Sequence, residues 1–284
     1  MRTIQLLFAV LLSLSCYAQD LTVIDTIKLK CSYEYKYLAD TTATTNKKYY
    51  SDILHLQIGS KSSKCFSYRT YQIDSISAYG DYHKYIRDIM LKARNEGLSR
   101  NEMIMKVPVR GMTTYVFKNH PDGKVTVLDN IFTDEFQYED DINPQEWDLQ
   151  EDSVKTIHGH ECQKATCNFR GREWTAWFAL DVPISDGPWK FSGLPGLIME
   201  VYDKGVQHYF CINGLQQMDS AEPLYFGIDG KNVSKFQKVK RADLLKKQYD
   251  YFRDPEKYRT MSTGISFGFS PGKYEVKHDL LERE

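Results

Sequence analysis

Three side chains that commonly bind metal ions stand at alternate positions in the middle of the sequence. His158, His160 and Cys162 are two residues apart, so on an extended strand they would project from one face. Imidazole and thiolate are good ligands for zinc or copper. Same-face residues lie about 6.6 Å apart, however, too far for three ligands to share an ion without a bulge. Because no fourth ligand stands nearby, we expect a plain strand face with neither metal nor cofactor.

Two arginines that flank a glycine form a second candidate site. Arg170 and Arg172 would share a face if the chain is extended, and guanidinium groups bind carboxylate or phosphate bidentately. They could therefore grip an acidic ligand or partner. The alternative is that they pair with internal acids and stack on tryptophans. The acids in question are Asp186 and Glu200, and the tryptophans are Trp174 and Trp177.

An aromatic and basic cluster follows shortly after. Trp189, Lys190 and Phe191 stand next to a turn, where they could form the mouth of an apolar pocket or close one end of the core. We take six residues as candidate binding residues: Arg170, Arg172, Trp174, Trp177, Trp189 and Lys190.

Established catalytic motifs are missing from the sequence. We find no nucleophile elbow, phosphate loop, dinucleotide fingerprint or His-Glu-x-x-His. A hydrolase or metal-dependent enzyme that uses His158, His160 or Asp186 remains the alternative to a binding protein. Asp181 and Ser185 could complete a notional triad, but a chain of this length offers many such triplets.

The most distinctive stretch runs from the FRGR segment at 169–172 to a Gly-Leu-Pro-Gly-Leu-Ile hexapeptide at 193–198. Pro195 and Gly196 suit the two central positions of a type II turn, which would launch a strand at Leu197. The sequence here resembles the GLPGLI family of exported Bacteroidota proteins over about Ile157 to Tyr202. That resemblance implies export and a β-rich fold, but it transfers no catalytic residue.

Composition limits the classes that fit. The 284 residues are 42% hydrophobic and 13% aromatic, which is typical of a folded globular protein. Lys and Arg number 37 against 38 acids, so bulk nucleic-acid binding is not expected. A mean hydropathy of −0.51 argues against a multispan membrane protein.

The first 18 residues have the pattern of a secretory signal. Arg2 precedes an apolar run from Ile4 to Leu14, and small residues precede a cleavage point after Ala18. We expect an extracytoplasmic mature protein with no membrane-spanning segment, and lipidation of Cys16 is the competing interpretation.

Export permits disulfides, and five cysteines would remain in the mature chain. The candidate pairs are Cys31 with Cys65 and Cys167 with Cys211. Buried unpaired thiols are the alternative.

Hydrophobic patterning predicts the elements that must position these residues. Apolar residues alternate with polar ones along most of the chain, which indicates strands. Those expected strands are 23–38, 54–58, 125–127, 174–180, 197–202, 209–212 and 265–269. Two stretches have the helical period: one from Tyr82 to a stop at Gly97, the other from Ser234 as N-cap to a stop near Pro255.

We therefore predict a mainly β fold, with a curved antiparallel sheet, as a half-barrel or open barrel, and two packed helices. Residues 19–284 would form one domain. The expected function is non-enzymatic binding of a lipid, a peptide or a partner protein at the cell envelope.

Overall fold

A computed structural model of the protein describes residues 21–42, 45–142, 145–264 and 279–283. The predicted signal segment at 1–18 and the predicted strand at 265–269 lie outside these ranges.

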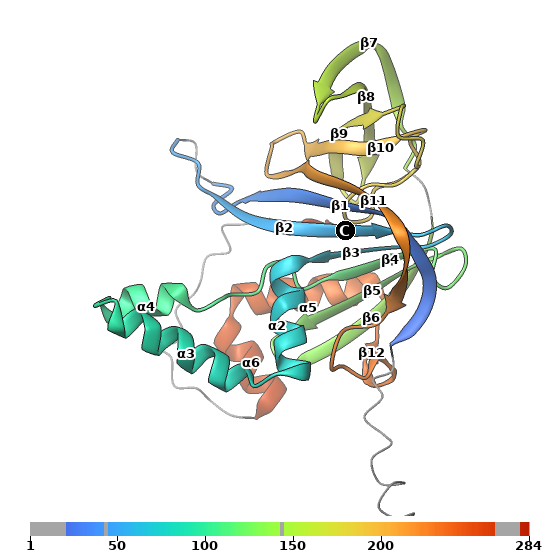
Figure 1. The fold of residues 1–284 in the computed structure, drawn as a ribbon. Helices are drawn as coiled ribbons and strands as arrows, with labels where there is room; N and C mark the ends of the chain where they lie inside the picture. The colour runs from blue at the N-terminus through green and yellow to red at the C-terminus, as the bar shows by residue number, and fades with distance from the viewer. Residues whose placement is uncertain (1–20, 43–44, 143–144, 265–278, 284) are drawn as a thin grey trace, which may run out of the picture.

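One open twelve-stranded sheet dominates the fold (Figure 1), in the order β12-β6-β5-β4-β3-β2-β1-β11-β10-β9-β8-β7. All neighbouring strands are antiparallel except β12 and β6. The strands are β1 (Thr22–Leu38), β2 (Tyr49–Ile58), β3 (Ser63–Ser67), β4 (Tyr115–Lys118), β5 (Lys124–Ile131), β6 (Asp134–Asp141), β7 (Asp148–Ile157), β8 (His160–Phe169), β9 (Arg172–Ala179), β10 (Leu197–Asp203), β11 (His208–Phe226) and β12 (Gln237–Lys238). The predicted mainly β class is confirmed.

Alternation along the strands explains how the two faces of the sheet are covered. On β1, Cys31, Tyr33 and Tyr35 are buried in the main core, while Lys30 and Ser32 point to the other face. Because the sheet curves, the main core also takes side chains from β8, β9, β10 and β11. A smaller core on the opposite face gathers around β3, β4 and β5.

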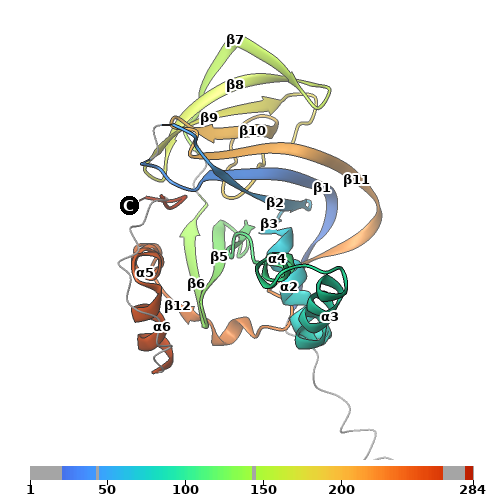
Figure 2. The same ribbon diagram turned by 90° about the vertical axis from the view of Figure 1, so that its left-hand side faces the viewer.

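Helices flank both sides of the lower half of the sheet. Figure 2 shows α5 and α6 on one side and α2, α3 and α4 on the other. Their bounds are α2 (Tyr68–Tyr79), α3 (Tyr82–Asn95), α4 (Arg100–Lys106), α5 (Arg241–Arg253) and α6 (Pro255–Thr263). Among the described residues no helix is both long and apolar enough to cross a membrane.

Of the two predicted helices, the first is confirmed as α3, with Gly97 at φ +76° just beyond it. The second does not begin at Ser234. Asn232 instead caps a short 3₁₀ turn (Val233–Lys235), and the chain then forms β12 beside β6. Only after this strand does α5 start, at Arg241. The pairing of β12 with β6 therefore overrides the local helical period.

The Gly-Leu-Pro-Gly-Leu-Ile segment bends at Pro195 and leads into β10, as predicted. The predicted type II turn is wrong, because Gly196 lacks the positive φ that this turn requires; the positive φ, +92°, belongs to Gly193. Gly196 is needed for another reason. A Cβ at this position would lie 2.0 Å from the carbonyl oxygen of Ala179 on the neighbouring strand β9.

None of the five described cysteines forms a disulfide, so the two candidate pairs are wrong and the alternative of unpaired thiols is confirmed. Strand β2 separates Cys31 from Cys65, since each pairs with Leu56 from opposite sides. Burial raises the pKa of the Cys31 thiol to about 12 and that of Cys65 to about 11, which keeps both in the unreactive protonated form.

Strand β7 forms one end of the sheet, and among the strands that the structure describes it pairs with β8 alone. Its register with β8 shifts between Gln150 and Val154, and the intervening Glu151 and Asp152 are exposed. The strand is therefore irregular and acidic in its middle.

Candidate ligand-binding site

Two of the predicted tryptophans build an aromatic cluster inside the sheet. Trp174 on β9 and Trp189 on the following loop are both almost fully buried, with ring centroids 6.3 Å apart. Each packs edge-on against Phe191, at 4.7 and 5.2 Å. The indole of Trp174 donates a hydrogen bond to the carbonyl oxygen of Phe169 at 3.0 Å. Trp189 belongs to the main core and also lines a pocket.

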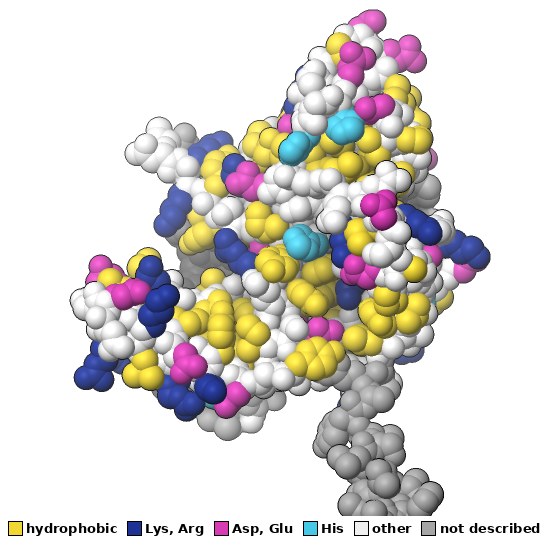
Figure 3. All heavy atoms as spheres, in the orientation of Figure 1, with side chains coloured by type: hydrophobic (Ala, Val, Ile, Leu, Met, Phe, Trp, Pro, Cys, Tyr) yellow, Lys and Arg dark blue, Asp and Glu magenta, His cyan; other side chains and the backbone are white. Residues whose placement is uncertain are grey.

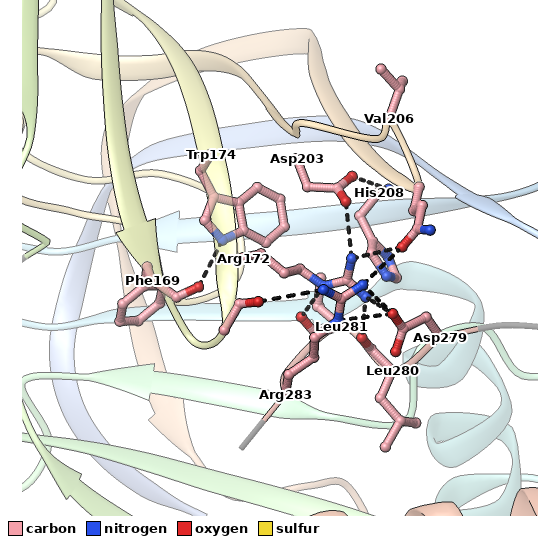
Figure 4. A network of polar contacts seen from close by, with 12 residues as sticks. Phe169, Arg172, Trp174, Asp203, Val206, His208, Asp279, Leu280, Leu281 and Arg283 are labelled. Atoms are coloured by element: carbon pink, nitrogen blue, oxygen red, sulfur yellow. Dashed lines mark hydrogen bonds and ion pairs between the residues drawn. The ribbon is translucent and has the colours of Figure 1, made fainter. Parts of the chain in front are cut away.

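Arg172 lies at the centre of a buried polar network (Figure 4). Its guanidinium donates to Asp203 and to Gln207, both at 2.9 Å. The same group also donates to the backbone carbonyls of Leu280, at 2.5 Å, and Leu281, at 3.1 Å. Arg172 therefore joins the β10–β11 turn to a segment that lies more than one hundred residues beyond Arg172 itself.

Lys190 and Arg170 hold the same segment through Glu282. The buried ammonium of Lys190 donates to the Glu282 carboxylate and to the hydroxyl of Tyr138. Arg170 lies 4.0 Å from Glu282 and Arg241 lies 3.5 Å from it. Burial alone would raise the pKa of Glu282, but the Lys190 and Arg170 charges outweigh burial and lower it. The carboxylate is therefore ionised in a nearly closed site.

The basic residues thus have internal acidic partners, as the alternative interpretation held, but the predicted acids are wrong. Asp186 pairs with Lys118, and Glu200 pairs with Lys155 at 2.6 Å. Lys155 also lies 4.4 Å from the ring centroid of Trp177, which is partly buried against the main core. The actual partners of the two arginines are Asp140, Asp203, Asp279 and Glu282.

Residues 279–282 form one wall of a pocket of about 540 Å³, which we call the aromatic pocket. In Figure 2 the short red segment 279–283 lies above α5. Tyr35 and Tyr37 stack with ring centroids 5.4 Å apart, and Tyr50 continues the row at 5.5 Å from Tyr37. The other aromatic lining residues are Phe132, Trp189, Tyr251 and Phe252.

A few polar groups converge on this pocket. The buried carboxylate of Asp129 accepts hydrogen bonds from Thr113 at 2.5 Å and from Gln248 at 2.6 Å. Burial raises the pKa of Asp129 to about 6, although these hydrogen bonds oppose the shift. Nδ1 of His208 lies 2.8 Å from the hydroxyl of Tyr35. Small-molecule sites are usually lined by apolar and aromatic side chains together with a few polar groups in fixed positions.

The proposed row of metal ligands does not exist. His158 and Gly159 form the turn between β7 and β8, both with positive φ, so His158 does not share a strand face with His160. His160 contacts Asp181 at 2.7 Å, and Cys162 is buried. In the part of the chain that the structure describes, no group of three or more His, Cys, Asp or Glu side chains could hold a metal ion. No described contact joins His158, His160 and Asp186.

Sequence reasoning missed most of the residues that line the pocket. One signal was present: Tyr33, Tyr35 and Tyr37 alternate on β1, which places all three on one face. By contrast, residues 279–283 are mostly charged and carry no periodic pattern. Their place beside Arg172 depends entirely on contacts between distant parts of the chain.

Comparisons with known proteins give a partial family match. Residues 168–200 match a family model described as "Protein of unknown function (Porph_ging)". This range holds the hexapeptide and all six predicted binding residues, which are Arg170, Arg172, Trp174, Trp177, Trp189 and Lys190. No curated protein matches the chain.

Similar solved structures include two crystal forms of PNGF-II. In its C2 form the identity is 11% and the TM-score 0.46, with 78% of this chain and 32% of that chain covered. The P21 form gives 10% identity, the same TM-score, and coverage of 78% and 33%. The chain therefore spans about a third of the length of these proteins.

Proposed function

We propose that this protein is an exported, non-enzymatic binding module of the GLPGLI family that holds a small amphipathic ligand in the aromatic pocket. The signal-like pattern at 1–18 supports export, and the family match at 168–200 supports the relationship. The observation that carries the proposal is the pocket itself. Its volume of about 540 Å³ falls within the range of small-molecule sites, and seven aromatic side chains line it.

The geometry also indicates the kind of ligand. Tyr37 and Tyr50 are half-buried to exposed, and together they offer flat apolar surface to an acyl chain or an apolar side chain. Asp129 and Thr114, which also line the pocket, offer hydrogen-bonding groups to a polar headgroup or a peptide amide. A lipid and a short apolar peptide share this chemistry, so the first measurement must identify which one is bound.

Native mass spectrometry of the protein purified from its own host makes this identification. A copurified lipid or peptide in a one-to-one complex is the expected result. A stoichiometric metal ion, or turnover of a substrate, would instead favour the hydrolase or metal-dependent enzyme and overturn the proposal.

Site-directed variants then locate the ligand. The double variant Tyr37→Ser, Tyr50→Ser removes the aromatic row, and we expect it to weaken binding of the fluorescent probe 1-anilinonaphthalene-8-sulfonate at least about tenfold, because each buried ring contributes on the order of 1 to 3 kcal/mol. Tyr249→Ser is the matched control, since Tyr249 is as exposed as Tyr50 but does not line the aromatic pocket. Equal probe affinity in both variants would contradict a site between the tyrosines.

A further inference from the structure

A second pocket, of about 660 Å³, lies on the face of the sheet that carries α2. We call it the lysine pocket. Figure 3 shows this face, where basic and histidine side chains lie among apolar ones in the middle, at the level of β2. Its floor consists of two rows of side chains that stand in register across four strands. One row is Gln216, Lys30, Gln57 and Lys64, and the other is Gly214, Ser32, His55 and Phe66.

The unusual member of this floor is Lys64. Only 7% of it is exposed, and its ammonium makes one described hydrogen bond, to the carbonyl oxygen of Gly227 at 3.2 Å. The rings of Phe66, Tyr115 and Phe117 surround it, with centroids 5.2 to 5.5 Å from the ammonium. No described carboxylate lies within 4.0 Å of it.

The other buried lysines of the described chain provide an internal comparison. Lys118 is paired with Asp186, and Lys190 is paired with Glu282. Buried charges in proteins are normally neutralised in this way, because an unpaired buried charge is costly. Lys64 is the exception among the three. Burial lowers its pKa to about 8, so most of its population stays charged at neutral pH.

The neighbouring charges do not supply the missing partner. Lys30 and Glu222 pair with each other at 2.6 Å across the rim. His55 is half-buried, and burial followed by the charge of Lys30 lowers its pKa, which favours the neutral ring. Asp229 lines the pocket outside salt-bridge distance of Lys64, and burial raises its pKa. The charges of Asp229 and Asp74 attract Lys64 and partly oppose the fall in its pKa, but neither carboxylate forms an ion pair with it.

We propose that the lysine pocket binds a small organic monocarboxylate whose carboxylate pairs with the ammonium of Lys64. The single positive charge of Lys64 is neutralised by the single negative charge of a carboxylate, whereas a phosphate monoester carries nearly two negative charges. Asp229 adds negative charge to the lining and opposes a dianion more strongly than a monoanion. Phe66, Tyr71 and Pro223 supply apolar surface for the body of the ligand. This site is separate from the aromatic pocket and does not depend on its function.

Thermal unfolding in the presence of defined probes tests the proposal. The probes are hexanoate, octanoate, phenylacetate and 3-phenylpropionate, each compared with its neutral primary amide, and octyl phosphate as the dianion. We expect at least one carboxylate to raise the Tm of the wild-type protein while its amide does not. Raising the pH from 7 to 9.5 should diminish this effect, because Lys64 loses its proton.

Variants of Lys64 provide the decisive comparison. Lys64→Met should weaken binding of the active carboxylate, measured by calorimetry, at least about tenfold, which is the usual effect of losing a hydrogen bond to a charged group. Lys64→Arg keeps the charge and should retain part of the affinity. Without ligand, Lys64→Met should be as stable as the wild type or more stable, because an unpaired buried charge has been removed.

Several results would overturn the assignment. The first two are that no carboxylate in the panel raises the Tm of the wild type, or that the amides raise it equally. The other two concern Lys64→Met: its Tm responds to the carboxylate as much as that of the wild type, or without ligand it unfolds at a clearly lower temperature. Stabilisation by octyl phosphate alone would exclude a monocarboxylate. The variant Tyr37→Ser, Tyr50→Ser should keep the carboxylate response, which separates this site from the aromatic pocket.

Discussion

Replacement of Arg172 by leucine removes the donor group that connects the β10–β11 turn to the pocket wall. The guanidinium is buried and donates to four oxygen atoms, on Asp203, Gln207, Leu280 and Leu281. Leucine keeps much of the apolar volume of the side chain but none of these hydrogen bonds. The variant therefore isolates the polar contribution of Arg172.

The magnitude follows from the burial of the partners. Asp203 is only 4% exposed, and removing one member of a buried ion pair typically costs about 3 to 5 kcal/mol. Asp203 keeps one hydrogen bond, from the backbone N–H of His208 at 2.8 Å. The carbonyls of Leu280 and Leu281 can turn to water if their segment detaches. We therefore expect a loss near the lower limit, about 3 kcal/mol, together with release of residues 279–283.

Urea unfolding followed by tryptophan fluorescence measures the global loss, and hydrogen exchange of residues 279–283 measures the local release. Lys204→Leu is the control, because Lys204 forms an exposed pair with Glu173 at 2.9 Å and should change stability by less than about 1 kcal/mol. Adding Asp203→Asn to Arg172→Leu should recover part of the loss, since it neutralises the charge left behind. A loss below about 1 kcal/mol with unchanged exchange at 279–283 would refute the reasoning.

Two further variants test other parts of the fold. The Asp129 carboxyl has its pKa raised from 3.8 to about 6 in the folded state, so the folded protein binds the extra proton between these values and stability falls as pH rises through this window. Asp129→Asn should remove that fall, up to about 3 kcal/mol, and flatten the profile of unfolding free energy between pH 4 and 6; a fall of unchanged size would assign it to other groups. Gly196→Ala should destabilise the protein by at least about 2 kcal/mol, because its Cβ would lie 2.0 Å from the carbonyl oxygen of Ala179, whereas Gly214→Ala meets only Ser32 at 3.4 Å and should be tolerated. Equal melting temperatures for the two alanine variants would contradict the close approach.

Features that depend on short-range pattern were predictable from the sequence. The alternation of apolar residues located β1, β2, β9 and β10, and the stripe from Tyr82 located α3. These elements are held by their own hydrogen bonds and by one buried face, both of which leave a period in the sequence. The bend at Pro195 belongs to the same class, although its turn type does not.

Features that depend on distant contacts were not predictable. Helix α5 begins later than the predicted start at Ser234 because β12 pairs with β6. No local sequence pattern predicts that pairing. The acidic partners of Arg170 and Arg172 come from elsewhere in the chain, so the predicted partners Asp186 and Glu200 are wrong. The sequence also could not predict that Lys64 forms no ion pair, since this depends on which carboxylates the neighbouring strands place near its ammonium.

The irregular strand β7 has a consequence for how separate molecules of this protein meet in solution. An outermost strand exposes unused N–H and C=O groups, which invite a strand from another molecule. Glu151 and Asp152 stand where the register of β7 breaks, so two such edges would bring like charges together along a kinked backbone. Mutual repulsion at this rim therefore disfavours edge-to-edge association, and crowded copies are protected from joining their sheets into fibres through β7.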